Sequence, residues 1–248
     1  MKITINNKVY YPEEIISTNL AQITGFEKAV IEFAKDWLTG KEQFIIPTSG
    51  STGVPKPITV TRGQMEYSAL QTVNALNLKK GNTALLCLNP EFIAGKMMLV
   101  RAFVRELDLV VVAPSSNPVL DIHEDTVIDF AALVPMQVQT ILDSTSNNVA
   151  KLESMKSVII GGAPINPVLL DRIKKLKANF YATYGMTETL SHIALKKLNG
   201  TEASDQFIAF EGVKLGQDAR GCLTINSPVT LNNTITTNDV VELLSPSA

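Results

Sequence analysis

The chain has 248 residues, of which 45% are hydrophobic and 19% are charged. This apolar content is enough for a sizeable core, so the composition predicts a globular protein of one large domain or two small ones. The 22 basic and 24 acidic residues give a net charge of -2. That balance lacks the basic excess typical of proteins that bind nucleic acid or anionic membrane surfaces, so no nucleic-acid partner is expected.

The sequence predicts neither membrane insertion nor secretion. No apolar run reaches about 18 residues, the length that a transmembrane helix needs. The opening stretch "MKITINNKVYYPEEI" has no apolar segment of signal-peptide length. Cys87 and Cys222 lie in apolar, strand-like runs and are expected to be buried thiols. Because no Cys or His residues cluster, we expect no zinc site built on them. Since the sequence predicts neither membrane insertion nor secretion, we expect a cytoplasmic protein.

The first third of the chain predicts a hairpin followed by two helices. Polarity alternates over residues 2–10, as in a short hairpin. Residues 24–38 fit an amphipathic helix, with Thr24 and Glu27 as its capping box. A second amphipathic helix is predicted over residues 61–78.

From about residue 80 to 185, predicted strands alternate with predicted helices. This pattern is typical of an α/β fold with a mostly parallel sheet flanked by helices. The predicted strands cover residues 83–88, 109–113, 125–130, 157–162 and 179–185, and the predicted helices cover residues 95–107, 134–143 and 166–177.

After residue 200 the composition of the chain changes. Short β-rich runs are separated by Gly, Asn, Asp and Pro, which predicts a small β-rich subdomain. We therefore expect one domain over residues 1–248, with an α/β part over 1–200 and a β-rich part over 201–248.

The stretch "IPTSGSTGVPKPITV", residues 46–60, gathers small hydroxyl residues, two glycines and a lysine between two apolar runs. Hydroxyls and backbone N–H groups that converge on one point form an anion site, which glycines let the backbone approach closely. Phosphate is the expected ligand. The spacing fits neither G-x-x-x-x-G-K-[ST] nor G-x-G-x-x-G. A polar surface turn is the alternative.

Four segments in chain order resemble motifs of the adenylate-forming superfamily, which includes acyl-CoA ligases, peptide-synthetase adenylation domains and luciferases. They are "TSGSTGVPKPI", "GGAPI", "YATYGMTET" and "TITTNDVVEL", and the resemblance covers residues 44–243. Pro57 and Asn238 stand where the family usually has glycine. The resemblance implies the large domain of the adenylate-forming enzyme fold.

Within that family, "YGMTETLSHIA" together with "RGCLTINSPV" resembles the o-succinylbenzoate–CoA ligases of menaquinone biosynthesis. This resemblance implies an ATP-dependent acid–CoA ligase that adenylates o-succinylbenzoate and then forms its CoA thioester. ATP, Mg²⁺ and coenzyme A are the cofactors and co-substrates implied. Another aryl- or acyl-acid CoA ligase and a non-catalytic nucleotide-binding module are the alternatives.

The resemblance also implies the roles of nucleotide-binding residues. Lys56 would neutralise phosphate charge, Thr187 would donate to the α-phosphate, and Glu188 would bind Mg²⁺. Tyr184 would lie on the adenine face, and Asp239 would accept the ribose hydroxyls. The alternative for Glu188 is a helix cap, the alternative for Tyr184 is a core residue, and the alternative for Asp239 is a turn residue. The other implied nucleotide-binding residues are Thr48, Ser49, Gly50, Ser51, Thr52, Gly53, Gly161, Gly162, Ala163 and Gly185.

The implied acid has an aromatic ring and two carboxylates, so it needs a cation besides the phosphate lysine. Lys96 and Arg101 follow a predicted strand and are candidates, with a solvated helix face as the alternative. Phe92 lies near the position of a histidine that the family often has. Ser191 and His192 follow the "YGMTET" motif and are candidates for the acid pocket, with a packed helix histidine as the alternative.

Members of the family carry a smaller C-terminal domain of about 100 residues, which follows the ribose aspartate. This sequence ends at residue 248, shortly after Asp239. We therefore expect the large domain alone, as a shortened piece of a longer protein, with the small C-terminal domain absent. Such a chain is expected to bind ATP or AMP but to adenylate poorly. Its expected partners are small molecules, and a homodimer is compatible with the sequence.

Overall fold

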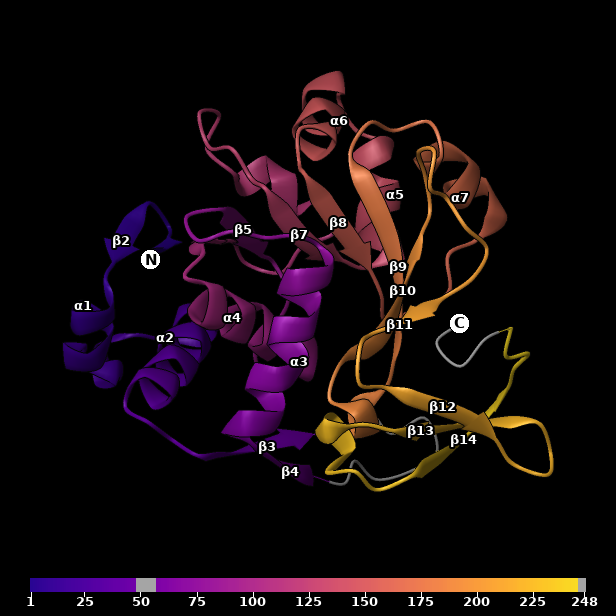
Figure 1. The fold of residues 1–248 in the computed structure, drawn as a ribbon. Helices are drawn as coiled ribbons and strands as arrows, with labels where there is room; N and C mark the ends of the chain where they lie inside the picture. The colour runs from indigo at the N-terminus through magenta and orange to yellow at the C-terminus, as the bar shows by residue number, and fades with distance from the viewer. Residues whose placement is uncertain (48–56, 245–248) are drawn as a thin grey trace.

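The structure is a computed structural model and describes residues 1–47 and 57–244. A nine-stranded mixed sheet runs through the molecule (Figure 1). Its strands are β1 (Ile3–Ile5), β2 (Lys8–Tyr10), β5 (Thr83–Leu86), β6 (Asp108–Val111), β7 (Phe130–Leu133), β8 (Ser157–Ile160), β9 (Asn179–Gly185), β10 (His192–Lys197) and β11 (Ile208–Ala209). Their order is β11-β10-β9-β8-β7-β5-β6-β1-β2.

The centre of this sheet is parallel and its two edges are antiparallel. The pairs β1–β6, β6–β5, β5–β7, β7–β8 and β8–β9 are parallel. The pairs β1–β2, β9–β10 and β10–β11 are antiparallel. The prediction of a mostly parallel sheet flanked by helices is therefore confirmed.

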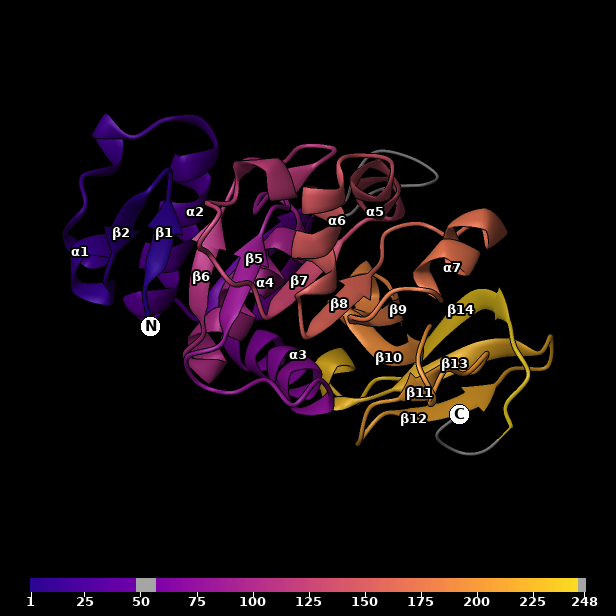
Figure 2. The ribbon, with the colours of Figure 1, turned by 90° about the horizontal axis from the view of Figure 1, so that it is seen from above.

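Helices cover both faces of the sheet. They are α1 (Pro12–Ser17), α2 (Gly25–Leu38), α3 (Arg62–Ala75), α4 (Ile93–Arg105), α5 (Pro135–Leu142), α6 (Ser146–Glu153) and α7 (Pro167–Ile173). Helix α3 lies on one side of the sheet, and α5 and α6 lie on the other (Figure 2). No helix among the described residues is both long and apolar enough to cross a membrane.

Strand periodicity divides the core between these two faces. Side chains alternate along a strand, so Ala84 and Leu86 join the apolar cluster under α2, α3 and α4, whereas Leu85 joins the one under α5, α6 and α7. The central strands are buried on both faces, as expected for a parallel sheet covered by helices.

Two smaller antiparallel sheets complete the fold. One pairs β3 (Gln43–Pro47) with β4 (Pro57–Thr61), and the other has the order β12 (Lys214–Gln217), β13 (Cys222–Asn226), β14 (Ile235–Val240). The three-stranded sheet lies near the lower end of α3 (Figure 1). The Gln64 side chain of α3 donates to the Val229 carbonyl at 2.6 Å, which joins the helix to this C-terminal region.

Several details differ from the sequence-based predictions, and α1 was not predicted. The strand expected over 125–130 starts only at Phe130, and neither α6 nor β10 was predicted. The capping box at Thr24 is wrong, because the Thr24 side chain makes no cap hydrogen bond. Glu27 instead accepts a hydrogen bond from the Tyr10 hydroxyl at 2.7 Å, so its carboxylate joins α2 to β2.

A substitution at Phe130 tests how much the core around the central sheet contributes to stability. Its side chain is fully buried on β7, so Phe130→Ala should lower the free energy of unfolding by about 3–5 kcal/mol through lost burial and a residual cavity. Urea denaturation followed by circular dichroism measures this. Val168→Ala is the control, because Val168 is 71% exposed and should change stability by less than about 0.5 kcal/mol. Equal effects of the two changes would contradict this description of the core.

Candidate active site

A pocket of about 1430 Å³ opens at the carboxyl ends of β7, β8 and β9. In parallel α/β sheets, ligands bind at this edge, because the loops that leave the strands converge there. The pocket brings together predicted residues from three separate parts of the sequence. Its lining includes Arg101, Gly161, Gly162, Ala163, Tyr184, Gly185, Thr187, Glu188, Ser191 and His192.

Two of these glycines are required by close contacts. A Cβ at Gly161 would lie 2.4 Å from the Thr183 hydroxyl oxygen of the neighbouring strand. A Cβ at Gly185 would lie 2.4 Å from both the Cα of His192 and the carbonyl oxygen of Ser191. The absence of a side chain at Gly185 therefore lets β9 and β10 meet directly beside the pocket.

A tight turn holds the "MTET" segment between β9 and β10. The short 3₁₀ helix η3 (Thr187–Thr189) forms its centre. The buried Thr189 hydroxyl accepts from the Met186 N–H at 2.9 Å and lies 2.8 Å from the Ser191 carbonyl. Leu190 has a φ of 65°, which is unusual for a branched residue and occurs mainly where the surroundings enforce it. Thr187 and Glu188 are thus displayed by a fixed turn.

Tyr184 and Asp239 meet across the two sheets. The Tyr184 hydroxyl donates to Asp239 Oδ2 at 2.6 Å, although the residues are 55 positions apart. Burial, together with the Asp239 carboxylate, raises the pKa of the Tyr184 phenol, so it stays protonated and remains a donor. The predicted adenine and ribose residues therefore lie in contact with each other, at the junction of β9 and β14.

Glu188 suits the role of a magnesium ligand. Its side chain is exposed at the pocket and has no hydrogen bond or ion pair with the described residues. In the described part of the chain, no three His, Cys, Asp or Glu side chains gather into a metal-binding group. Mg²⁺ is commonly held by one or two protein carboxylates plus substrate phosphates. The donor set at this pocket therefore fits Mg²⁺ that arrives with a nucleotide.

Arg101 is a buried cation at the pocket. It is only 2% exposed and forms no ion pair with any described carboxylate. One Nη donates to the Ser191 hydroxyl at 3.0 Å, and Nε has no partner among the described residues. Burial lowers the pKa of Arg101 to about 9, which leaves the guanidinium charged at neutral pH. The pocket therefore contains a positive charge with unused donor capacity.

Two other substrate candidates lie outside this pocket lining. Lys96 Nζ donates to the Pro90 and Glu91 carbonyls, at 2.6 and 3.0 Å, so it fastens the preceding loop to α4. Phe92 is 53% exposed at the N-cap of α4. The predicted phosphate-loop residues Thr48, Ser49, Gly50, Ser51, Thr52, Gly53 and Lys56 lie outside the described residues.

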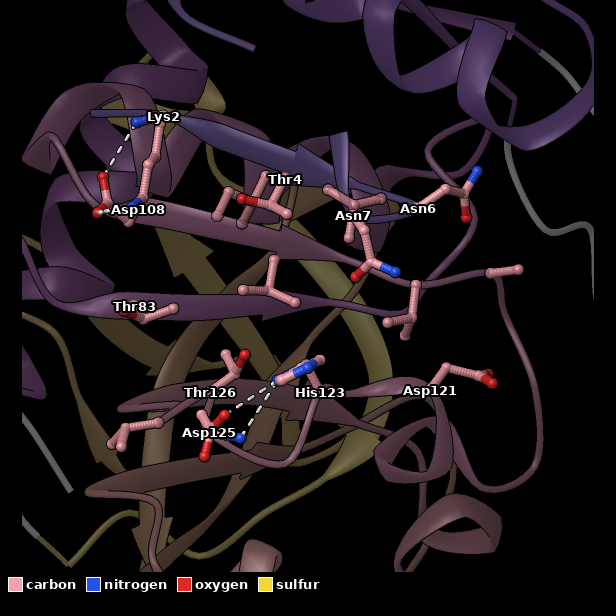
Figure 3. Close-up of a pocket in the computed structure, with 16 residues that line it drawn as sticks. Lys2, Thr4, Asn6, Asn7, Thr83, Asp108, Asp121, His123, Asp125 and Thr126 are labelled. Carbon is pink, nitrogen blue, oxygen red and sulfur yellow. Dashed lines mark hydrogen bonds and ion pairs between the residues drawn. The ribbon is translucent and has the colours of Figure 1, made fainter. Parts of the chain in front are cut away.

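A second pocket, of about 740 Å³, lies over strands β1, β6 and β5, away from the carboxyl ends of β7, β8 and β9 (Figure 3). Several of its polar side chains bond to backbone groups within the pocket. Asp108 accepts from the Lys2 backbone N–H at 3.0 Å, and the Asp125 N–H contacts His123 Nδ1 at 3.4 Å. None of the predicted site residues that the structure describes lines it. We therefore place the candidate active site at the carboxyl ends of β7, β8 and β9.

The chain matches a known protein family. The profile described as AMP-binding enzyme matches residues 25–210, which is most of the chain. The chain belongs to the AMP-binding enzyme family. The matched range spans the strands β7, β8 and β9, whose carboxyl ends form the larger pocket.

Named relatives in this family include 2-succinylbenzoate–CoA ligases. The one from Bacillus cytotoxicus is 25% identical over 191 residues, which cover 76% of this chain and 39% of the relative. The one from Bacillus subtilis strain 168 is 29% identical over 153 residues, which cover 59% of this chain and 30% of the relative. The chain thus spans about two fifths or less of the length of these relatives.

Solved structures of the family share the fold. An acyl-CoA synthetase (AMP-forming)/AMP-acid ligase II-like protein from Dyadobacter fermentans is 42% identical, with a TM-score of 0.87 over 95% of this chain and 67% of that one. O-succinylbenzoate coenzyme A synthetase from Bacillus subtilis, in complex with ATP and magnesium, is 20% identical. Its TM-score is 0.63 over 77% of this chain and 42% of that one. At that identity the second likeness concerns the fold alone.

The sequence analysis missed Thr189 and Thr72, two buried hydroxyls beside the site. Thr189 fixes the "MTET" turn, and nothing in its sequence context distinguishes it from the other hydroxyl residues there. Thr72 contacts His192 Nε2 at 3.0 Å. It follows Ser68 by one turn on the buried face of α3, so polar residues on an otherwise apolar helix face were the available signal.

His192 makes the stability of this fold depend on pH. Burial, reinforced by the nearby charge of Arg101, holds the pKa of His192 well below 6.5. In the unfolded chain His192 takes up a proton near pH 6.5, whereas in the folded chain it does not, so stability falls as the pH drops below about 6.5. The contribution of His192 to the slope should approach about 1.4 kcal/mol per pH unit.

Urea denaturation between pH 7.5 and 5 measures this slope. His192→Gln should flatten it relative to the unchanged chain, since carboxylates contribute equally to both. His123→Gln is the matched control, because the His123 side chain is 65% exposed, and it should leave the slope as it was. Equal slopes for all three chains would contradict a neutral, buried His192.

Proposed function

We propose that the chain forms the nucleotide- and acid-binding part of an AMP-forming acid–CoA ligase whose acid carries a second carboxylate, with o-succinylbenzoate as the substrate. The observation that carries this proposal is Arg101, a buried guanidinium without a carboxylate partner among the described residues, in the same pocket as the nucleotide residues. The names of the relatives from Bacillus and the family match support it.

The nucleotide half of the pocket would bind ATP. Gly161, Gly162 and Tyr184 would border the adenine, and Asp239 would accept the ribose hydroxyls while Tyr184 holds its other oxygen. Thr187 is offered by the turn between β9 and β10, where its hydroxyl would donate to the α-phosphate. The fixed turn would hold Thr187 in place, so its hydroxyl would stabilise phosphate charge without having to rearrange during the reaction.

The first reaction joins two anions. A carboxylate oxygen of the acid bonds to the α-phosphorus, the bond to pyrophosphate breaks, and the acyl-adenylate forms. Positioning and charge neutralisation lower this barrier. Mg²⁺, held by Glu188 and the phosphates, would supply Lewis-acid charge neutralisation. In the second reaction the CoA sulfur bonds to the acyl carbon and AMP leaves.

Arg101 favours a dicarboxylate over a fatty acid. Burying a charge without a partner is costly, and a carboxylate ligand repays that cost with charge-assisted hydrogen bonds. A fatty acid would place methylene groups against the guanidinium and leave it unpaired. Lys56 and the other phosphate-loop residues, the CoA site, the homodimer and the cytoplasmic location stay predictions.

Binding measurements test the acid assignment. The chain should bind a stable sulfonyl analogue of o-succinylbenzoyl-AMP more tightly than the benzoyl analogue, the decanoyl analogue or AMP, by isothermal titration calorimetry. Arg101→Met should weaken binding of the succinylbenzoyl analogue roughly 10- to 100-fold, because it removes charged hydrogen bonds. AMP affinity should change less than about twofold, because the nucleotide half is intact.

Lys96→Met is the matched control, since Lys96 also lies on α4 but its ammonium contacts loop carbonyls outside the pocket lining. It should leave the preference for the succinylbenzoyl analogue in place. Equal binding of all adenylates by the unchanged chain would keep the nucleotide site and discard this acid. Binding of none would argue against both.

A further inference from the structure

A series of buried and half-buried polar side chains leads from the middle of α3 to the pocket. Thr72 Oγ1 lies 3.0 Å from His192 Nε2, and His192 Nδ1 lies 3.4 Å from the Ser191 hydroxyl. Ser191 in turn accepts from the Arg101 guanidinium at 3.0 Å. Thr72 is fully buried and does not line the pocket, whereas the other three residues do.

The hydrogen bonds that link Thr72, His192, Ser191 and Arg101 fit one tautomer of His192 best. The Thr72 hydroxyl donates to the Ser68 carbonyl at 3.4 Å, which leaves its oxygen available to accept from His192 Nε2–H at 3.0 Å. His192 Nδ1 is then bare and accepts the Ser191 hydroxyl hydrogen, which leaves a Ser191 lone pair for Arg101, a group that can only donate. The opposite tautomer would use the Thr72 hydrogen on His192 and lose the bond to Ser68.

The surroundings keep this histidine neutral. His192 packs edge-on against Phe210, with ring centroids 5.4 Å apart, and the Arg101 cation acts on it electrostatically. A second positive charge at His192 would be buried beside the first. It would also turn Nδ1 into a donor, and the Ser191 hydroxyl would lose its acceptor there.

We propose that Thr72 is a positioning residue: through the Nε2–H tautomer of His192 it fixes the Ser191 hydroxyl, and Ser191 holds Arg101 in the orientation that receives the second carboxylate. The part of this inference that concerns the acid rests on the proposed function. The part that concerns the His192 tautomer is independent of the proposed function, because it is argued only from the hydrogen bonds of Thr72, His192 and Ser191.

Ser191 is important for the orientation of Arg101, because the guanidinium makes few other hydrogen bonds with the described residues. Among the described residues its other hydrogen bond runs from one Nη to the Met98 sulfur at 3.6 Å, and sulfur is a weak acceptor. A guanidinium with a fixed plane discriminates between ligands better than a mobile one, because its paired donors match a carboxylate in one orientation. Thr72 therefore influences which acid binds without touching it.

Nitrogen NMR tests the tautomer directly. The chain has two histidines, so a long-range ¹H–¹⁵N spectrum shows two imidazoles, and His123→Gln assigns them. His192 should appear as the neutral Nε2–H tautomer from pH 6.5 to 8. In Thr72→Val its Nε2 signal should shift and the Nδ1–H tautomer should become populated, since the acceptor is gone. Titration of His192 in this range, or the Nδ1–H tautomer in the unchanged chain, would overturn the proposal.

Binding measurements test the consequence for the acid. Thr72→Val should weaken binding of the succinylbenzoyl adenylate analogue roughly 5- to 30-fold, with AMP affinity unchanged. Thr72→Ser should restore it, because it returns the hydroxyl. Ser68→Ala is the matched control: it removes a buried hydroxyl without a described partner, one turn away on the same helix, and should have no effect.

The outcomes separate the two proposals. If the unchanged chain does not prefer the succinylbenzoyl analogue, the proposed substrate fails, while the NMR result still decides the role of Thr72 in setting the tautomer. If the preference exists and Thr72→Val keeps it, the positioning role fails. If Thr72→Val is less stable and loses affinity equally for the analogue and for AMP, Thr72 has only a structural role. That result would also overturn the positioning role.

Discussion

A guanidinium buried without a carboxylate partner among the described residues is the constraint on which the proposed acid half of this site depends. Charged groups are costly to bury unless they are paired and fully hydrogen-bonded. Arg101 receives one strong acceptor, Ser191, which is itself held through His192 and Thr72. The fold thereby keeps a positive charge desolvated and oriented at the pocket. A carboxylate that binds there completes the hydrogen bonds that the described residues leave unmade.

The parallel sheet provides the geometry for both halves of the site. The carboxyl ends of β8 and β9 lie side by side, so the glycines after β8 and the "YGMTE" segment at the end of β9 meet although they are more than twenty positions apart. Gly185 lets β10 approach closely enough to bring Ser191 and His192 to the same pocket. The three-stranded sheet adds Asp239, which reaches Tyr184.

The sequence predicted the elements whose pattern is local. The alternation of strands and helices revealed the parallel sheet, and the motifs "GGAPI" and "YATYGMTET" indicated residues at its carboxyl edge. It did not distinguish Lys96 from Arg101, because both lie on one helix and only packing shows which is buried in the pocket. Thr72 was missed for a related reason: its role depends on a contact with His192, 120 residues away. The Glu27 prediction failed because Tyr10 offered its carboxylate a tertiary partner.

A crystal structure of the chain with a stable sulfonyl analogue of o-succinylbenzoyl-AMP tests the central claim most directly. The decisive quantity is the distance from the Arg101 guanidinium to the ligand carboxylate that is not joined to the nucleotide. The account predicts hydrogen-bond distances of about 2.7–3.0 Å, with the adenosine between the end of β8 and Tyr184. A ligand carboxylate that points to solvent, with Arg101 still unpaired, would contradict it.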